Sequence, residues 1–262
     1  MPTVKYFFAE NVLIAYLDLC GTRFAYSQLS LDQQMSRLGH VISRALEGLD
    51  NTFRGAQNSL YVHMFADSVV VAERTPIEDC AGKFIRWLLD FQYHVLQDSV
   101  GLELKGQREL SEQKRYMPIL SRGIVGRGQY FGLLFEQHQN SIDEVLFNPS
   151  LLGGSSLLKM DTDLKGLPMG IYIDVPTLST CQIEEGRLIE VEASRLKFIK
   201  PLPDFDSLRS LFPAGSPENF EDWISKLVEM AGDSQDFFNS LKPWADAVQG
   251  RLRSIKRRTY SR

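Results

Sequence analysis

The sequence predicts an α/β fold, an α+β sandwich in which helices cover one face of a mainly antiparallel sheet, followed by a C-terminal helical extension. Three observations lead to this class. Long amphipathic helical patterns alternate with short β-rich runs, two of these runs are adjacent, and 262 residues with 44% hydrophobic content suffice to bury one sizeable core. We therefore expect an α/β domain over residues 1–203 and a helical extension with a basic tail over residues 204–262.

The first expected elements are a buried strand and a long helix. An apolar run predicts a strand over 11–17, and the residues after it, Asp18-Leu19-Cys20-Gly21-Thr22, predict a tight glycine turn. Ser30, with Gln33 three residues later, matches a capping box, and apolar residues then recur at helical spacing as far as Phe53. This pattern predicts one long amphipathic helix.

A hairpin and a second helix are expected next. The β-rich runs over 60–65 and 68–72 are separated by two residues, the second of which is Asp67, so the hairpin would carry this acid at its tip. Apolar residues at helical spacing over 77–96 predict a second long helix. The polar stretch over 106–115 predicts an exposed loop.

The remaining pattern completes the sheet and then becomes helical. It predicts a strand over 117–125, a turn over 126–130, a short helix over 150–160, a strand over 169–175 and a last edge strand over 190–201. From Phe205 onward the apolar residues are spaced as in helices.

Composition and charge argue against several classes of partner. The formal net charge of −4 argues against general binding of nucleic acid. The longest uninterrupted apolar run, over 12–17, is far shorter than the roughly 20 residues that span a bilayer, so we expect no membrane segment. The N-terminus lacks the pattern of a signal peptide, and the three cysteines lack zinc spacing. A cytoplasmic protein with reduced thiols is expected.

Two aspartates are the candidate chemical centre. Asp18 ends an apolar strand, where an uncompensated carboxylate is costly to bury, and Asp67 lies at a hairpin that would flank this strand. Two such carboxylates suit Mg²⁺ or Mn²⁺, whereas the alternative makes Asp18 a cap and Asp67 an ordinary turn residue. The turn over 19–23 could direct successive amides at a triphosphate, with Gly21 allowing close approach and Arg23 adding a charged donor.

Three motifs together resemble the signatures of class III nucleotide cyclases. They are Ala15-Tyr16-Leu17-Asp18-Leu19-Cys20-Gly21-Thr22, Phe65-Ala66-Asp67-Ser68 and Ser121-Arg122-Gly123-Ile124-Val125-Gly126-Arg127-Gly128. The likeness spans roughly residues 12–174 and is greatest to the compact bacterial branch that contains the pyrimidine cyclases of Pycsar antiphage defence. The resemblance implies a ferredoxin-like cyclase homology domain.

The resemblance also implies a reaction and its site. Asp18 and Asp67 would hold two Mg²⁺ or Mn²⁺ ions together with the carbonyl of Leu19, and Leu19, Cys20, Gly21 and Thr22 would cradle the phosphates. The ribose 3′-hydroxyl would attack the α-phosphate of a nucleoside triphosphate in line, without a covalent intermediate. Family members form head-to-tail homodimers with composite active sites, so a homodimer is implied here.

The sequence departs from the family at the positions that read the base. His63 and Val145 stand where purine cyclases carry a lysine and an acid. A donor-capable His63 favours uracil or cytosine, although a histidine satisfied within a strand is an equal alternative. The asparagine and arginine that stabilise the transition state in related enzymes are not found between residues 148 and 156. Lys159, Arg122 or Arg127 could supply that charge, and Arg122 could equally be a structural ion-pair partner.

The leading hypothesis is a pyrimidine nucleotide cyclase that uses UTP, with CTP second, and makes a cyclic product that signals in antiviral defence. One alternative is a degenerate cyclase-like domain that binds a nucleotide or a partner without turnover. Another is a purine cyclase with unusual base contacts.

Overall fold

The computed structural model describes residues 3–20, 30–65, 67–109, 120–136, 150–153, 155–164, 167–181, 183, 188–190, 196–199, 242, 245–246 and 249. Its strands are β1 (Thr3–Cys20), β2 (Leu60–Phe65), β3 (Ser68–Glu73), β4 (Leu120–Glu136), β5 (Ser150–Gly153), β6 (Gly170–Asp174), β7 (Leu188–Glu190) and β8 (Leu196–Ile199). Its helices are α2 (Leu31–Thr52), α3 (Cys80–Glu109), α4 (Ser155–Leu164), α5 (Val175–Leu178) and the 3₁₀ turn η1 (Gln57–Ser59).

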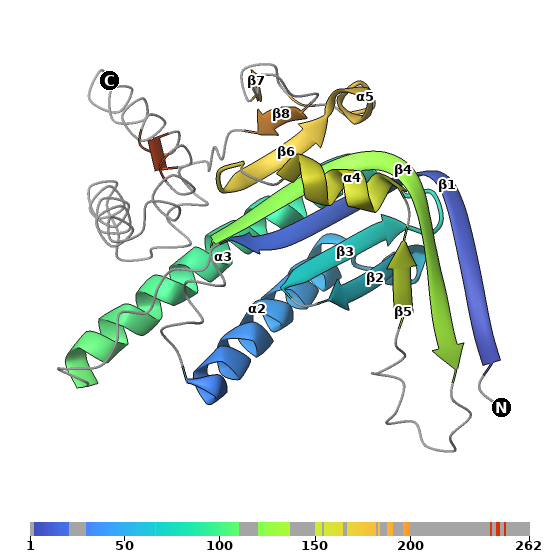
Figure 1. Cartoon of the computed structure of the whole chain (residues 1–262). Coiled ribbons are helices and arrows are strands. Elements are labelled where there is room, and N and C mark those ends of the chain that lie inside the picture. Colours follow the sequence, from blue (N-terminus) through green and yellow to red (C-terminus); the bar gives the residue numbers. More distant parts are fainter. Residues whose placement is uncertain are drawn as a thin grey trace.

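The strands form one mixed sheet of eight strands in the order β2-β3-β1-β4-β6-β8-β7, with β5 paired to β4 outside this row (Figure 1). Among the described pairings, β4 with β6 is parallel and the others are antiparallel. The α/β class predicted from the sequence is therefore confirmed. The predicted final edge strand is wrong in one respect, because β8 lies inside the row and β7 takes the edge.

The two long strands β1 and β4 dominate the sheet. They pair from Thr3 opposite Glu136 to Cys20 opposite Leu120, with a register shift between Ala9 and Val12. Bulges of this kind bend strands, and Figure 1 shows both strands curving away from the sheet as a two-stranded arm. The predicted turn over 126–130 is wrong, because β4 stays paired with β1 on both sides of the register shift that falls within these residues.

The helix predictions hold with two changes. α2 begins after Ser30 with the expected capping box, since Ser30 and Gln33 exchange both hydrogen bonds. α3 continues to Glu109, so the loop predicted over 106–115 is wrong for residues 106–109, and residues 110–119 lie outside the described part. The predicted helix over 150–160 is split, because residues 150–153 pair with β4 as strand β5 before α4 begins.

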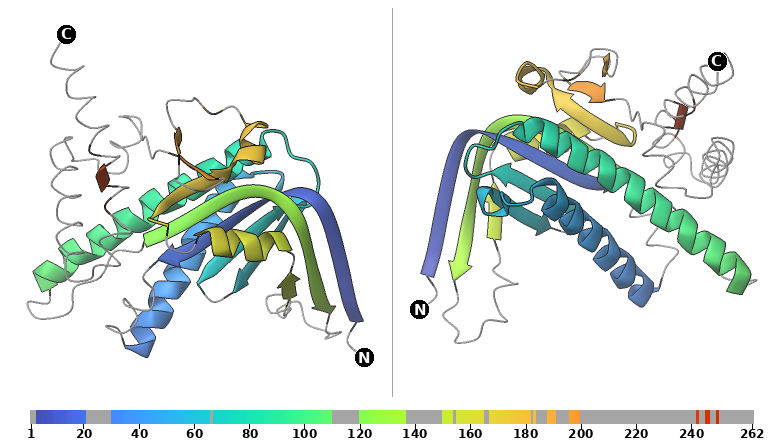
Figure 2. Two further views of the ribbon diagram at one scale, coloured as in Figure 1. Left: turned by 45° about the horizontal axis from the view of Figure 1, so that its top comes forward. Right: turned by 180° about the vertical axis from the view of Figure 1, so that it is seen from behind.

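The sheet has a buried layer on each face. Leu13, Ala15 and Leu17 of β1 pack with the apolar sides of α2 and α3, and Figure 2 shows both long helices on this face. The alternate residues Ile14 and Tyr16 pack on the other face with α4. The prediction that helices cover one face is thus correct for the two long helices, while the short helix α4 covers part of the opposite face.

Two glycines of β4 let helices approach both faces. A Cβ at Gly123 would lie 2.9 Å from Leu88 Cδ1 of α3, and a Cβ at Gly126 would lie 2.8 Å from Met160 Cε of α4. These contacts are too close for a side chain larger than hydrogen. Gly123 and Gly126 of the third sequence motif are therefore explained by packing.

The predicted C-terminal helical extension lies almost wholly outside the described residues, as does the boundary expected at residue 203. In the part of the chain that the structure describes, no helix is both long and apolar enough to cross a membrane.

Candidate active site

The fold brings Asp18 and Asp67 together at one end of the sheet. Asp18 lies near the end of β1 and is paired with Ser68, the first residue of β3, and with Arg122 of β4. Asp67 directly precedes Ser68, and its carbonyl accepts a hydrogen bond from the amide of Leu19 at 3.3 Å. Two acids that are far apart in the sequence thus flank the same strand end.

The carboxylate of Asp18 is engaged at both oxygens. Its Oδ2 accepts a hydrogen bond from Nη2 of Arg122 at 2.5 Å, and its Oδ1 accepts one from Oγ of Ser68 at 3.3 Å. The Asp18 side chain is only 16% exposed. Burial raises its pKa, the Arg122 charge lowers it, and the nearby charge of Asp67 raises it again. A cation bound between the two acids would offset both the cost of burying the charge of Asp18 and its repulsion by Asp67.

Arg122 joins the site to α4. Its Nη2 binds Asp18, while its Nη1 donates to the carbonyls of Leu164 at 2.7 Å and Leu167 at 3.4 Å. The sequence left two roles open for Arg122, and the structure shows the ion pair that the structural role requires. A catalytic role for Arg122 remains a proposal.

Tyr16 makes a second connection from the site to α4. Its hydroxyl lies 3.2 Å from Oγ of Ser68 and donates to Oδ1 of Asp161 at 3.3 Å. Burial raises the pKa of Tyr16 to about 12, so the hydroxyl keeps its proton and can donate. The sequence motifs contain Tyr16 and Ser68, but nothing in the sequence points to Asp161.

His63 lies on the same face of the sheet, on β2. His63 is 8% exposed, and the centroid of its ring lies 5.8 Å from that of Tyr130 of β4. Burial lowers the pKa of His63 to about 4, so the imidazole is neutral at physiological pH and carries one N–H donor.

Lys159 and the described residues of the predicted phosphate cradle are less well placed than Arg122 to contact a substrate near Asp18 of the same chain. Lys159 lies on the exposed side of α4 and forms an ion pair with Asp163 of the same helix. The amide of Leu19 donates to the carbonyl of Asp67, so it is engaged within the fold, and its place in a phosphate cradle stays a prediction. The Cys20 thiol is buried, and burial raises its pKa to about 12. Gly21, Thr22 and Arg23 lie outside the described residues.

The donor set fits a hard divalent cation. Among the residues that the structure describes, no cluster of three or more His, Cys, Asp or Glu side chains forms a ready metal cage. Asp18 and Asp67 instead offer two carboxylates, to which a backbone carbonyl and substrate phosphates could be added. Mg²⁺ and Mn²⁺ are commonly bound in this way.

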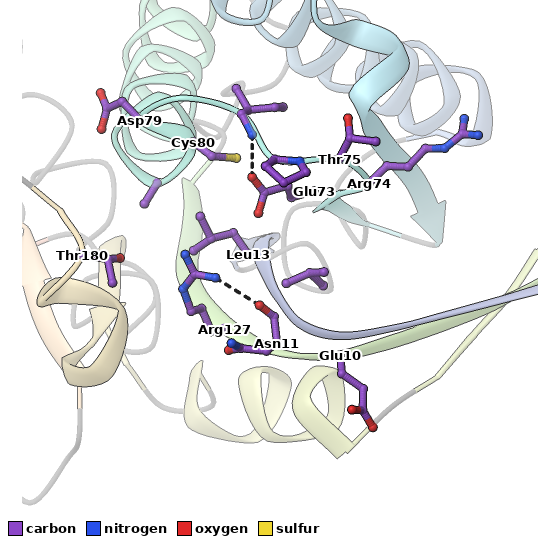
Figure 3. Close-up of a pocket in the computed structure, with 14 residues that line it drawn as sticks. Glu10, Asn11, Leu13, Glu73, Arg74, Thr75, Asp79, Cys80, Arg127 and Thr180 are labelled. Carbon is purple, nitrogen blue, oxygen red and sulfur yellow. Dashed lines mark hydrogen bonds between the residues drawn. The ribbon is translucent and has the colours of Figure 1, made fainter.

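A pocket of about 510 Å³ lies elsewhere, between β1, β3 and the start of α3 (Figure 3). Arg127 lines it and donates to the carbonyl of Asn11 at 3.0 Å. Because residues five apart on a strand face opposite sides, Arg127 and Arg122 lie on opposite faces of the sheet. Within one chain Arg127 therefore faces away from Asp18, and its role as the source of positive charge stays a prediction.

Comparison with solved structures shows the class of fold. A bacterial light-regulated adenylyl cyclase superposes with a TM-score of 0.54 at 12% identity, over 81% of this chain and 58% of that one. The guanylyl cyclase Cya2 gives 0.51 at 13% identity, over 76% and 93%. The guanylate cyclase domain of RhGC from Catenaria anguillulae, in complex with GTP, gives 0.50 at 13% identity, over 73% and 94%.

The chain thus has the fold of the adenylyl and guanylyl cyclase catalytic domains. It spans a little over half the length of the light-regulated adenylyl cyclases that it matches. No protein-family model and no curated protein matches the sequence.

Proposed function

We propose that this chain is a nucleotide cyclase that converts a nucleoside triphosphate into the 3′,5′-cyclic monophosphate and pyrophosphate. The observation that carries the proposal is the meeting of Asp18 and Asp67 at one strand end, in a fold shared with adenylyl and guanylyl cyclases. The sequence motifs that resemble class III cyclases include both acids.

Asp18 and Asp67 would hold two Mg²⁺ or Mn²⁺ ions, with the carbonyl of Leu19 as a further ligand. The chemistry that such ions supply when bound is a lower pKa for the ribose 3′-hydroxyl and neutralisation of charge on the departing pyrophosphate. The protein's own part is to fix the two carboxylates. Pairing of β1 with β3 sets their separation, and Ser68 and Arg122 orient the carboxylate of Asp18.

A pyrimidine substrate, UTP before CTP, is our proposal for specificity. A neutral His63 with one N–H donor suits a base carbonyl, and it stands where the resemblance places the lysine of purine cyclases. A role for the cyclic product as an antiviral signal, and a cytoplasmic location, rest on the sequence alone.

The chain is proposed to act as a head-to-tail homodimer with composite sites. Lys159 is exposed on α4 and paired with Asp163, so a catalytic role for it would require a site on a neighbouring chain.

The test is direct. Purified protein is incubated with each of the four ribonucleoside triphosphates and Mn²⁺, and products are identified by mass spectrometry. We expect cyclic UMP, with cyclic CMP second, and a loss of at least about a hundredfold in Asp67→Asn. The exposed Asp50→Asn serves as control and should keep full activity. No cyclic product from any triphosphate would exclude the enzyme, and cyclic AMP alone would exclude the pyrimidine assignment.

A second candidate function is nucleotide binding without turnover. The ion pair between Asp18 and Arg122 favours it, because a carboxylate neutralised by arginine has less need of a metal. Under this alternative the protein binds a nucleoside triphosphate in calorimetry, but forms no product and is unaffected by Asp67→Asn.

A further inference from the structure

Arg122 occupies a position from which it can leave Asp18 without losing all of its partners. Its Nη2 binds the carboxylate of Asp18, while Nη1 binds the carbonyl of Leu164, the last residue of α4. Carbonyls at the end of a helix carry partial negative charge and attract cations. The guanidinium is therefore held between two negative groups, one on β1 and one at the end of α4.

The ion pair is close but not fully satisfied. The side chains of Arg122 and Asp18 are 17% and 16% exposed, so both charges are largely removed from water. Nε of Arg122 is buried and has no hydrogen-bond partner among the described residues. Buried ion pairs gain little net free energy once desolvation is counted, and least when hydrogen-bonding capacity is left over. Transfer of Asp18 from Arg122 to another cation therefore gives up little net free energy of the pair itself, but it leaves the guanidinium with only carbonyl partners, a cost that the incoming cation must offset.

We propose that Arg122 is a resident counterion of Asp18, which a divalent cation must displace, so that Arg122 sets the cation concentration at which the site fills. The proposal rests on the cation site of the proposed function. A divalent ion on the carboxylate of Asp18 would lie close to the guanidinium and repel it. Arg122 would then keep its contacts with Leu164 and Leu167 at the end of α4.

This arrangement couples the site to α4. While Arg122 bridges Asp18 and Leu164, it ties the end of α4 to β1. Once a cation takes over Asp18, only the contact of Arg122 with the helix end remains. Binding of a divalent cation at Asp18 should therefore weaken the connection between α4 and β1. Arg122 acts as a positioning residue, because it holds Asp18 without the cation and the end of α4 with it.

The experiment measures Mn²⁺ affinity without nucleotide, by loss of the free Mn²⁺ signal in electron paramagnetic resonance at about pH 8. Arg122→Met removes the competing charge and should bind Mn²⁺ roughly fivefold more tightly than the wild type. Arg122→Lys keeps the charge but loses the fork that spans Asp18 and Leu164, so we expect roughly twofold tighter binding. Arg127→Met is the matched control, because Arg127 lies on the same strand and faces the opposite side.

The outcomes separate cleanly. Unchanged or weaker Mn²⁺ binding in a folded Arg122→Met overturns the proposal, and if Arg122→Met fails to fold, unchanged or weaker binding in Arg122→Lys does so. Equal tightening in Arg127→Met overturns it too. Absence of Mn²⁺ binding in the wild type overturns it as well. If the wild type binds Mn²⁺, Asp18→Asn does not, and Arg122→Lys binds more tightly, the counterion role stands whether or not any triphosphate is cyclised.

Discussion

At the scale of single residues, the cost of burying a charge makes the site visible in the sequence. Asp18 follows six apolar residues, so its carboxylate needs compensation, and the structure supplies it through Arg122 and Ser68. The partners themselves could not be predicted. Tyr16 and Asp161 are 145 residues apart, and no local pattern indicates that their side chains meet.

His63 makes stability depend on pH. Its pKa in the folded protein is about 4, below the usual 6.5, because burial disfavours the charged ring. The unfolded chain therefore binds more protons between these values, so this contribution to stability is complete above about pH 6.5 and is lost as the pH falls towards 4. We expect urea denaturation to show that the free energy of unfolding falls by about 2 kcal/mol on account of His63 between about pH 7 and pH 4.5.

The comparison is between the wild type and His63→Phe, which retains an aromatic ring beside Tyr130. His63→Phe should flatten the pH dependence of unfolding between about pH 7 and pH 4.5. An unchanged pH dependence in His63→Phe would mean that the buried imidazole does not resist protonation.

At the scale of elements, sequence patterns predicted the structure correctly where interactions between neighbouring residues determine it. The capping box at Ser30 and the hairpin formed by β2 and β3 were both predicted and are both present. Local signals failed at residues 126–130, where Gly126 and Gly128 suggested a turn. Pairing along β1 overrides this preference, and the absence of a side chain at Gly126 instead admits α4.

Gly123 should be essential to the packing of α3. Its added Cβ would lie 2.9 Å from Leu88 Cδ1 and 3.0 Å from Ile171 Cδ1, both within the buried layer. Gly123→Ala must therefore displace core side chains, and we expect a loss of about 1–3 kcal/mol in the free energy of unfolding, measured in urea. Gly39→Ala on α2 meets nothing within 4 Å and should stabilise by about 0.5–1 kcal/mol. Equal effects of the two changes would refute the packing argument.

At the scale of the whole molecule, the site depends on an arrangement that no single segment specifies. Asp18 lies on β1, Arg122 on β4 and Asp67 directly before β3, and the order β3-β1-β4 places them side by side. The sequence indicated which residues carry the chemistry, through motifs and the cost of burial. It could not indicate that α4 covers the same face as Asp18, because strand order and helix placement depend on contacts between distant segments.

A dimer with composite sites predicts complementation between two inactive chains. Lys159 is exposed on α4 and paired with Asp163, whereas Asp67 lies at the strand end, so the two residues would serve one site from different protomers. Lys159→Ala alone should lose about a hundredfold in cyclase activity, as expected for a charge at the reacting phosphate. Lys242→Ala, which breaks a similar exposed pair with Asp246, should stay active.

Co-expression of Asp67→Asn and Lys159→Ala chains in equal amounts should then restore activity. Half of the dimers would be mixed, and each mixed dimer would hold one site that has both an intact Asp67 and an intact Lys159. Since that is one of two sites, recovery should reach about a quarter of the wild-type activity. Sites built within single chains would give no recovery, because every site would carry one of the two defects. Product formation by the mixed and unmixed preparations, measured at equal protein concentration, therefore decides whether neighbouring copies share the reaction.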